Sequence, residues 1–394
     1  MYLHWAVVAV LGCVAAGWLA TFFDLAVNIR SVPHLDKVEP LSGTNLPRVS
    51  ILFSARDEAA KLPAAIATFL AVDYPNLEVI AVNDRSSDAT REILDAAAAK
   101  DPRLKVVHIA DLPPGWLGKT HGLQTAFEAS TGEWLIFTDA DVKFAPDVIR
   151  RALKLALDQH IDHLPLLGFS ETTTFGEKIL MSFFGMSFAI GTKPWRKSSP
   201  GSRFYVGVGA FQMVRRSAYV AMGEHKRLAM EVVDDIKLGK LMQNTGFRSQ
   251  AAFCGKRVSV YWHQGVAATI RGTEKNFFAT SQYSLPFAIA QIAALLVGVE
   301  FPWIALFLIY GWPHDHMRVV AFACAATAIA IPVIMEVAVA SSFEISPLYS
   351  LTEPIGGLLV GWMLVRSTYV TLKNGGISWR GTFYPLDALK RGLA

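Results

Sequence analysis

The stretch EWLIFTDADV, Glu133–Val142, decides the fold class of this chain. An apolar run in it ends at two aspartates one residue apart, Asp139 and Asp141. Alternate residues of an extended chain point the same way, so both carboxylates can converge where a strand ends. Mg²⁺ and Mn²⁺ take such oxygen ligands and usually keep others from a substrate phosphate. The stretch therefore indicates a buried strand that ends at a site for a metal-bound diphosphate. The alternative is a solvated turn, where Asp is also favoured.

The flanking segments alternate between strand-like and helix-like patterns. The further predicted strands are 49–53, 77–82 and 104–109. The predicted helices are 62–70, 91–100 and a segment that ends at 130. This alternation implies a largely parallel sheet that helices cover on both faces. We therefore predict an α/β fold whose ligands bind at the carboxyl ends of the strands.

Polar residues gather where the predicted strands end. The clusters are Arg56-Asp57-Glu58, Asp84, Lys119 and Asp139/Asp141. Because the carboxyl ends of parallel strands meet at one edge of a sheet, we expect these clusters to share one crevice. Four coincident clusters are difficult to explain as turns, so the pattern favours a binding site.

Five motifs resemble, in the same order, those of the family 2 glycosyltransferases with a GT-A fold. They are SILFSARDE, AVNDRSSDAT, GWLGKTHGL, FTDADV and EVVDDIKLGKLMQNTG. The resemblance covers roughly Arg48–Gly265 and implies a Rossmann-like nucleotide-diphospho-sugar transferase domain. The segments GWLGK, RGTEKNFFA and WRGTFY resemble the membrane-bound branch that includes hopene-associated and carotenoid glycosyltransferases. The sequence lacks the QxxRW motif of cellulose-synthase-like members, which argues against a processive polysaccharide synthase.

The resemblance implies roles for the residues of a donor site. Asp84 would contact the uracil or the ribose of a UDP-sugar, while Arg56, Asp57 and Glu58 would line the nucleotide pocket. Lys119 would face the phosphate or the sugar of the donor.

The metal and the catalytic base are implied in the same way. Asp141 would bind Mg²⁺ or Mn²⁺ directly, and Asp139 would touch the ribose or complete the metal shell. Asp235 matches the position of the catalytic base of the family. The chemistry agrees with this role, since inversion at an anomeric carbon needs a carboxylate that takes the acceptor's proton. Asp234 stands where the family often has Glu and is assigned to the donor site. The alternative for Asp234 and Asp235 is helix N-capping, since a helix-forming stretch follows directly.

Arg271 and Lys275 lie four residues apart in RGTEKN, so they share one face if that segment is helical. Two interpretations remain open. The two cations clamp the donor diphosphate where other branches use QxxRW, or they form a basic face that meets anionic lipid headgroups.

The composition predicts a membrane protein. Hydrophobic residues make up 52% of the 394 residues, and the mean hydropathy is +0.34, which is too apolar for an ordinary soluble enzyme. The predicted membrane spans are Trp5–Phe23, Pro286–Tyr310, Val319–Ala340 and Pro354–Leu372. The first span is long enough to cross a bilayer and has the features of a signal anchor.

These features give a predicted organisation in five parts. The parts are an anchor (1–30), a GT-A domain (45–265), an interfacial segment (266–284), about three membrane helices (285–372) and a basic tail (373–394). Arg30 and Lys37, with the basic segments 193–203 and 271–275, favour a catalytic domain at the cytoplasmic face of the inner membrane. The basic tail favours the same side, which three later spans would not allow, so the topology of the C-terminal spans stays open.

The sequence therefore predicts a multi-pass, membrane-bound inverting glycosyltransferase that moves one sugar from a UDP-sugar to a lipid. A net charge of +4 without a basic-aromatic stripe argues against nucleic-acid binding. Two alternatives remain. The first is transfer to a polyprenyl-phosphate carrier, which hardly needs a general base. The second is a non-catalytic membrane scaffold with a degenerate nucleotide-binding domain.

Overall fold

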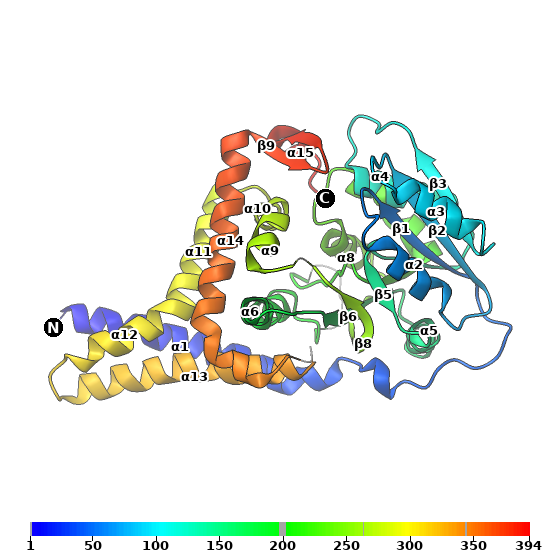
Figure 1. Cartoon of the computed structure of the whole chain (residues 1–394). Coiled ribbons are helices and arrows are strands. Elements are labelled where there is room, and N and C mark those ends of the chain that lie inside the picture. The colour runs from blue at the N-terminus through cyan, green and yellow to red at the C-terminus, as the bar shows by residue number, and fades with distance from the viewer. Residues whose placement is uncertain (1, 197–201, 263, 343–344) are drawn as a thin grey trace. The chain divides into compact units, whose positions relative to one another are not determined.

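The computed structural model describes residues 2–196, 202–262, 264–342 and 345–394, so part of the basic segment 193–203 lies outside the described residues. The chain forms two compact units (Figure 1). The sheet unit comprises Val32–Glu171, Thr192–Trp262 and Gly376–Ala394. The helical unit comprises Met1–Ser31, Thr172–Gly191 and His263–Gly375.

An eight-stranded sheet forms the centre of the sheet unit in the described part of the chain. Its strands are β1 (Val49–Ala55), β2 (Leu77–Asp84), β3 (Leu104–Ile109), β4 (Trp134–Phe137), β5 (Val142–Phe144), β6 (His163–Ser170), β7 (Gln212–Arg215) and β8 (Ala252–Val260). Their order is β3-β2-β1-β4-β7-β6-β8-β5. The first four strands are parallel, as predicted.

The other half of the sheet is mixed, which corrects the prediction of a largely parallel sheet. Strand β7 runs antiparallel to β4 and β6, and β5 runs antiparallel to β8, while β6 and β8 are parallel. Strands β5 and β7 have only three and four residues, which is too short to give a periodic signal in the sequence.

Helices cover both faces of this sheet. They are α2 (Leu62–Leu70), α3 (Thr90–Ala98), α4 (Gly118–Glu128), α5 (Val148–Asp158), α7 (Arg216–Met222) and α8 (Asp234–Asn244). Alternate residues of β1 serve the two faces, because successive side chains of a strand point to opposite sides. Ile51 and Phe53 belong to a core cluster with residues of α2 and α5, whereas Leu52 packs in a second cluster with residues of α4 and α8.

The predicted basic tail folds as part of the sheet unit. Strands β9 (Gly376–Trp379) and β10 (Thr382–Pro385) form an antiparallel hairpin, and α15 (Leu386–Arg391) follows. The last carbonyl, of Ala394, accepts hydrogen bonds from the Nζ atoms of Lys237 and Lys240 at 3.0 and 2.8 Å. The chain end is therefore fixed on α8, the helix that begins with Asp234 and Asp235.

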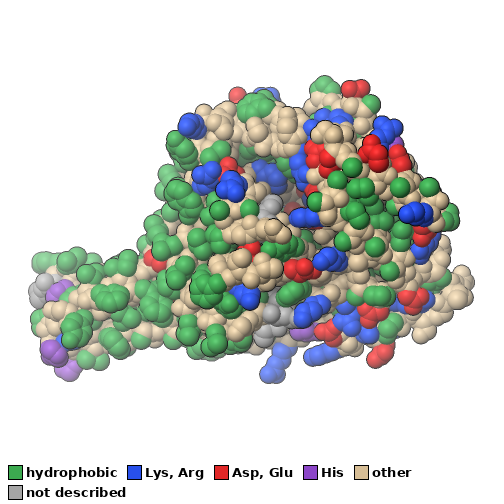
Figure 2. All heavy atoms as spheres, viewed as in Figure 1, with side chains coloured by type: hydrophobic (Ala, Val, Ile, Leu, Met, Phe, Trp, Pro, Cys, Tyr) green, Lys and Arg blue, Asp and Glu red, His purple; other side chains and the backbone are tan. Residues whose placement is uncertain are grey.

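Within its described residues, the helical unit contains four helical stretches that could cross a membrane by length and composition, at Tyr2–Ser31, Leu285–Tyr310, His316–Ala340 and Pro347–Asn374. Its helices are α1 (Tyr2–Asn28), α6 (Phe175–Thr192), α9 (Val266–Gly272), α10 (Glu274–Thr280), α11 (Leu285–Leu295), α12 (Phe301–Tyr310), α13 (His316–Ser342) and α14 (Glu353–Asn374). A π-helical turn, Leu296–Glu300, joins α11 to α12. Figure 2 shows hydrophobic side chains covering α12 and α13, and large ones such as Phe307 are exposed there, as expected for a lipid-facing surface.

Two charged side chains within these stretches, Glu336 and Arg366, have polar partners. The carboxylate of Glu336 accepts a hydrogen bond from the hydroxyl of Ser182. Arg366 pairs with Glu274 at 2.5 Å. Charges in membrane segments are costly unless they are paired, so these contacts explain how the unit accommodates them.

The helix expected to carry both Arg271 and Lys275 is interrupted. Helix α9 ends at Gly272 and α10 begins at Glu274, with Thr273 between them at φ −97° and ψ 0°. The two cations therefore lie on different helices, so the condition for one shared helical face, a single helix through both, is not met. Both belong to the helical unit, whereas all the other predicted site residues belong to the sheet unit.

Candidate functional site

The carboxyl ends of the parallel strands bring the predicted clusters to one edge of the sheet. Strand β1 ends at Ala55 and leads into Arg56, and β2 ends at Asp84 itself. The guanidinium of Arg56 lies 4.0 Å from the carboxylate of Asp84. Strand β4 ends at Phe137, two residues before Asp139. The clusters that follow the neighbouring parallel strands β1, β2 and β4 therefore lie at the same edge of the sheet.

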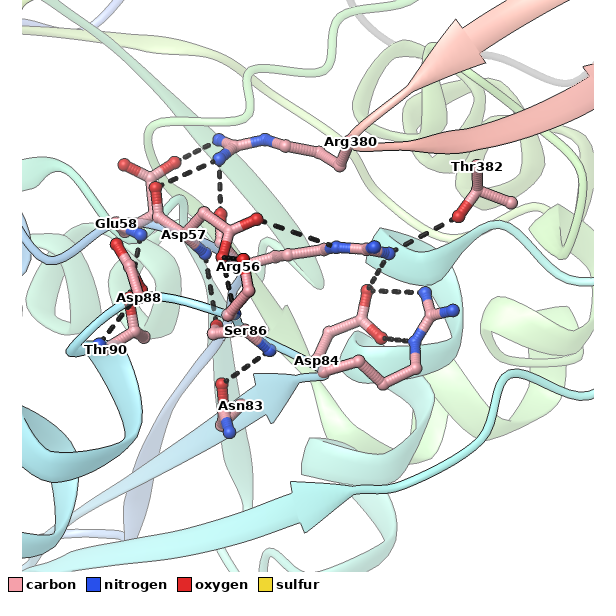
Figure 3. A network of polar contacts seen from close by, with 12 residues as sticks. Arg56, Asp57, Glu58, Asn83, Asp84, Ser86, Asp88, Thr90, Arg380 and Thr382 are labelled. Carbon is pink, nitrogen blue, oxygen red and sulfur yellow. Dashed lines mark hydrogen bonds and ion pairs between the residues drawn. The ribbon is translucent and has the colours of Figure 1, made fainter.

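The loop after β1 is fastened to the loop after β2 (Figure 3). The backbone N–H of Asp57 donates to Ser86 Oγ at 3.1 Å, and its carboxylate accepts from the N–H of Ser87 at 2.7 Å. The N–H of Glu58 donates to Thr90 Oγ1 at 2.8 Å. These contacts hold Asp57 in the left-handed region, at φ 54°, where residues other than glycine are uncommon. These hydrogen bonds therefore fix the loop after β1 against the loop after β2.

Asp84 is a buried anion held by arginine. Its carboxylate accepts two hydrogen bonds from the guanidinium of Arg85, at 2.7 and 3.2 Å, and its residue is 3% exposed. A Cβ at Gly118 would lie 2.2 Å from Asp84 Oδ2. The first residue of α4 must therefore be glycine, because any side chain there would displace the carboxylate that is predicted to read the nucleoside.

Lys119 joins two of the predicted carboxylates. Its Nζ lies 3.0 Å from Asp139 Oδ1 and 3.2 Å from Asp234 Oδ1. Burial alone would lower the pKa of Lys119, but the charges of Asp139 and Asp234 raise it well above the ordinary lysine value. The same residues line a small cavity together with Asp235, Gly209 and His225. Lys119 is therefore a permanent cation at the centre of a carboxylate cluster.

Backbone groups orient Asp235. Its Oδ2 accepts from the N–H of Gly209 at 2.8 Å, and its Oδ1 accepts from the N–H of Ile236 at 2.8 Å. A Cβ at Gly209 would lie 2.8 Å from Asp139 Oδ2 and 3.3 Å from Asp235 Oδ2. Glycine thus lets the two carboxylates approach the same stretch of backbone.

The N-capping alternative fails for both aspartates. Helix α8 begins at Asp234, and its N-cap residue is Val233, so neither aspartate occupies the N-cap position. Burial raises the pKa values of Asp234 and Asp235, and the charge of Lys119 opposes this rise. Asp235 is therefore a stronger base than an exposed aspartate would be.

Asp141 makes an ion pair that the sequence did not predict. Its Oδ2 lies 2.7 Å from Lys61 Nζ, which also donates to the carbonyl of Tyr261 at 3.1 Å. No group of three His, Cys, Asp or Glu side chains within the described residues is arranged to hold a metal ion. Mg²⁺ needs only one or two carboxylates when a diphosphate supplies further oxygens, so Asp139 and Asp141 fit such an ion. In the structure, Asp141 pairs with the ammonium of Lys61 and Asp139 with that of Lys119, so the lysines balance the charge of the two carboxylates.

Two further residues of the site carried no sequence signal. Lys61 belongs to none of the sequence motifs, and its partner Asp141 is eighty residues away in the chain. His225 lines the cavity, and its Nδ1 contacts the hydroxyl of Tyr219 at 2.6 Å. Burial lowers the pKa of His225 to about 3, so the ring is neutral. Only the fold brings these residues to the site.

Known proteins resemble the chain over this region. Residues 50–222 match the model of Glycosyl transferase family 2. A 4,4'-diaponeurosporenoate glycosyltransferase of Staphylococcus haemolyticus is 24% identical over 283 residues, which cover 70% of this chain and 72% of that enzyme. A beta-monoglucosyldiacylglycerol synthase of Trichormus variabilis is 33% identical over 113 residues, covering 28% of this chain and 24% of that enzyme.

A solved structure shares the fold. The mannosyltransferase PcManGT of Pyrobaculum calidifontis, in complex with GDP-Man and Mn²⁺, superposes with a TM-score of 0.52 at 20% identity, over 92% of this chain and 99% of that one. The similarity between the two proteins lies in the arrangement of their helices and strands. Taken with the ordered motifs and the carboxylates at the strand ends, these similarities show that the chain has the GT-A fold and that residues 50–222 form a domain of Glycosyl transferase family 2.

Proposed function

We propose that this enzyme transfers one sugar, with inversion, from a UDP-sugar to a hydroxyl or carboxyl group of a membrane lipid. One observation carries the proposal. Asp139 and Asp235 both approach the backbone of Gly209, beside the ammonium of Lys119. A donor diphosphate near Asp139 and a base at Asp235 would then flank one reacting carbon.

The lipid acceptor is supported by the relatives and by the helical unit. The names of the two relatives refer to a carotenoid acid and to a diacylglycerol glycolipid. Four helical stretches long and apolar enough to cross a membrane accompany the catalytic unit. We place the catalytic unit at the cytoplasmic face of the inner membrane, where UDP-sugars are made and where the basic residues next to the spans would remain.

The residues divide the chemistry between them. The acceptor oxygen forms a bond to the anomeric carbon as the bond from that carbon to UDP breaks, and Asp235 takes the acceptor's proton. The electron pair leaves with the diphosphate, whose growing charge Lys119 would stabilise more in the transition state than in the ground state. A divalent cation bound by Asp141 and Asp139 would supply further positive charge to the same oxygens. Asp84, with Arg56, Asp57 and Glu58, would hold the nucleoside.

As the pH is lowered, kcat/KM should begin to fall at a higher pH than it would if the base were a carboxylate with an ordinary pKa. Only deprotonated Asp235 accepts a proton, and burial raises its pKa above the ordinary value of about 4. kcat/KM is therefore expected to be full above this raised pKa and to decrease tenfold per pH unit below it. A profile of kcat/KM between pH 4.5 and 8 measures it. A flat profile down to pH 4.5 would contradict the assignment of Asp235 as base.

Metal dependence provides a separate prediction. Asp141→Asn removes a charged oxygen ligand, so we expect a loss of about 10²-fold or more in kcat/KM and a weaker apparent affinity for Mn²⁺. The matched control is Asp158→Asn, an exposed aspartate on α5 whose salt bridge to Lys154 lies within that helix. UDP release measured over a Mn²⁺ titration checks both variants. Equal Mn²⁺ curves for Asp141→Asn and the unmodified chain would exclude Asp141 as a metal ligand.

A further inference from the structure

We propose that the C-terminal hairpin β9–β10 is a wall of the nucleotide pocket, and that Arg380 and Tyr384 are positioning residues for the donor. The inference rests on the proposed function, because it takes Asp84 and the 56–58 loop as the nucleoside-binding groups. The hairpin follows the last membrane-length helix and lies about three hundred residues after β1 in the chain. Its contacts within the sheet unit nevertheless reach three separate segments of the pocket.

Arg380 holds the loop that follows β1 (Figure 3). Its guanidinium donates to the backbone carbonyls of Arg56 and Asp57, the latter at 3.3 Å, and to the carboxylate of Glu58. One planar fork thus engages three consecutive residues, which a lysine could not do. The arginine side chain is 41% exposed, so it does not fill the core. Its contacts are polar and are made with the 56–58 loop.

The hairpin turn is built to present this arginine. Strand residues Trp379 and Thr382 pair directly, which leaves Arg380 and Gly381 as a two-residue turn. Both have positive φ, 50° and 75°. Such turns favour Asn or Asp followed by Gly, and an arginine in the left-handed region is unfavourable for the backbone. Arg380 is thus a strained residue at the tip of the hairpin, and its contacts with the 56–58 loop indicate a functional role.

Tyr384 contacts the other two segments of the pocket, at Arg85 and Gly118, and Thr382 adds a contact to Arg56. The hydroxyl of Tyr384 accepts a hydrogen bond from the N–H of Gly118 at 3.3 Å, at the first residue of α4, and it also interacts with the guanidinium of Arg85. Thr382 Oγ1 accepts from Arg56 at 3.4 Å. Arg56, Arg85 and Gly118 all lie next to the carboxylate of Asp84. The hairpin therefore contacts three residues beside the carboxylate predicted to read the nucleoside.

The charge of Arg380 also acts on Glu58. Burial raises the pKa of Glu58, and the positive charge of Arg380 opposes that rise. Without Arg380, the pKa of Glu58 would rise further, and the 56–58 loop would lose three hydrogen bonds. Both changes would loosen the loop and leave the rest of the sheet unit intact.

Titration calorimetry of the purified full-length chain with UDP and Mn²⁺ tests the proposal. We expect Arg380→Ala to bind UDP about tenfold more weakly, in line with the loss of hydrogen bonds to a charged group. Tyr384→Phe keeps the buried ring and is expected to weaken binding about threefold. Arg380→Lys keeps the charge without the fork and should recover only part of the loss. The control is Arg391→Ala, an exposed arginine of the same tail, which should bind UDP like the unmodified chain.

Kinetics separates positioning from a general loss of structure. For Arg380→Ala, KM for the donor should rise about tenfold with kcat changed less than about twofold, whereas partial unfolding would lower kcat and leave KM alone. UDP affinity and donor KM that match the unmodified chain in both Arg380→Ala and Tyr384→Phe would overturn the inference. That failure is distinct from failure of the proposed function, in which Asp141→Asn would leave UDP release unchanged.

Discussion

Asp235→Asn is expected to lower kcat about 10³-fold while UDP binding stays within about twofold of the unmodified chain. The amide cannot accept a proton at neutral pH, so the attacking hydroxyl keeps its proton as the bond to the sugar forms. The nucleoside end of the donor site is separate from this defect, because Asp84 is held by Arg85 and Arg56 and not by α8. Asn also has one oxygen where Asp235 uses two to meet the N–H groups of Gly209 and Ile236. A small fall in thermal stability should therefore accompany the loss of activity.

Single-turnover transfer from a radiolabelled donor, with UDP calorimetry on the same protein, measures these effects. Asp158→Asn is again the matched control, because it makes the same chemical change on the exposed face of α5. Retention of more than about a tenth of the activity by Asp235→Asn would show that no general base is needed. That result would favour an acceptor such as polyprenyl phosphate, which is already ionised.

Gly207→Ala is expected to reduce transfer about 10²-fold without touching any side chain of the site. A Cβ at Gly207 would lie 1.8 Å from the carbonyl oxygen of Asp235 and 2.8 Å from the Cα of Ile236. Both are backbone atoms and cannot rotate away, so the first turn of α8 must move. A displacement of about 1 Å in a catalytic group is sufficient for a loss of this size.

The matched control for this change is Gly191→Ala, because a Cβ at Gly191 meets nothing within 4 Å. Transfer kinetics and UDP affinity are measured for both variants. The displaced base should lower kcat in Gly207→Ala, and UDP affinity should change little because Gly207 does not contact the Asp84 end of the site. Full activity of Gly207→Ala would mean that Asp235 does not need its present position.

The sequence predicted those parts of the fold that local patterns determine. The helix 62–70 and the strand 104–109 have the predicted bounds, because each is rich in apolar residues and has clear ends. The strand predicted at 77–82 extends to Asp84, since polar residues at a strand end carry no apolar signal. The sequence also predicted polar groups where the parallel strands end, and Asp84 does end β2 while Asp139 follows β4. Asp234 and Asp235 follow no parallel strand, and only the family resemblance pointed to them.

Features set by distant pairing were not predictable from local patterns. Lys61 meets Asp141 only because β1 and β4 are neighbours in the sheet. The tail was predicted only as basic, but the hairpin it forms depends on contacts to Glu58 and Gly118 from the other end of the chain. Arg271 and Lys275 would share one face if a single helix carried both, and the break at Thr273 separates them.

The most direct test of the account measures UDP release by the detergent-purified chain with Mn²⁺ and a panel of UDP-sugars, with and without lipids extracted from the host. Asp141→Asn and Asp235→Asn are assayed beside it. The account predicts release that depends on lipid, occurs with at least one UDP-sugar and is lost in both variants. Absence of release under every condition, together with no UDP binding by calorimetry, would contradict it.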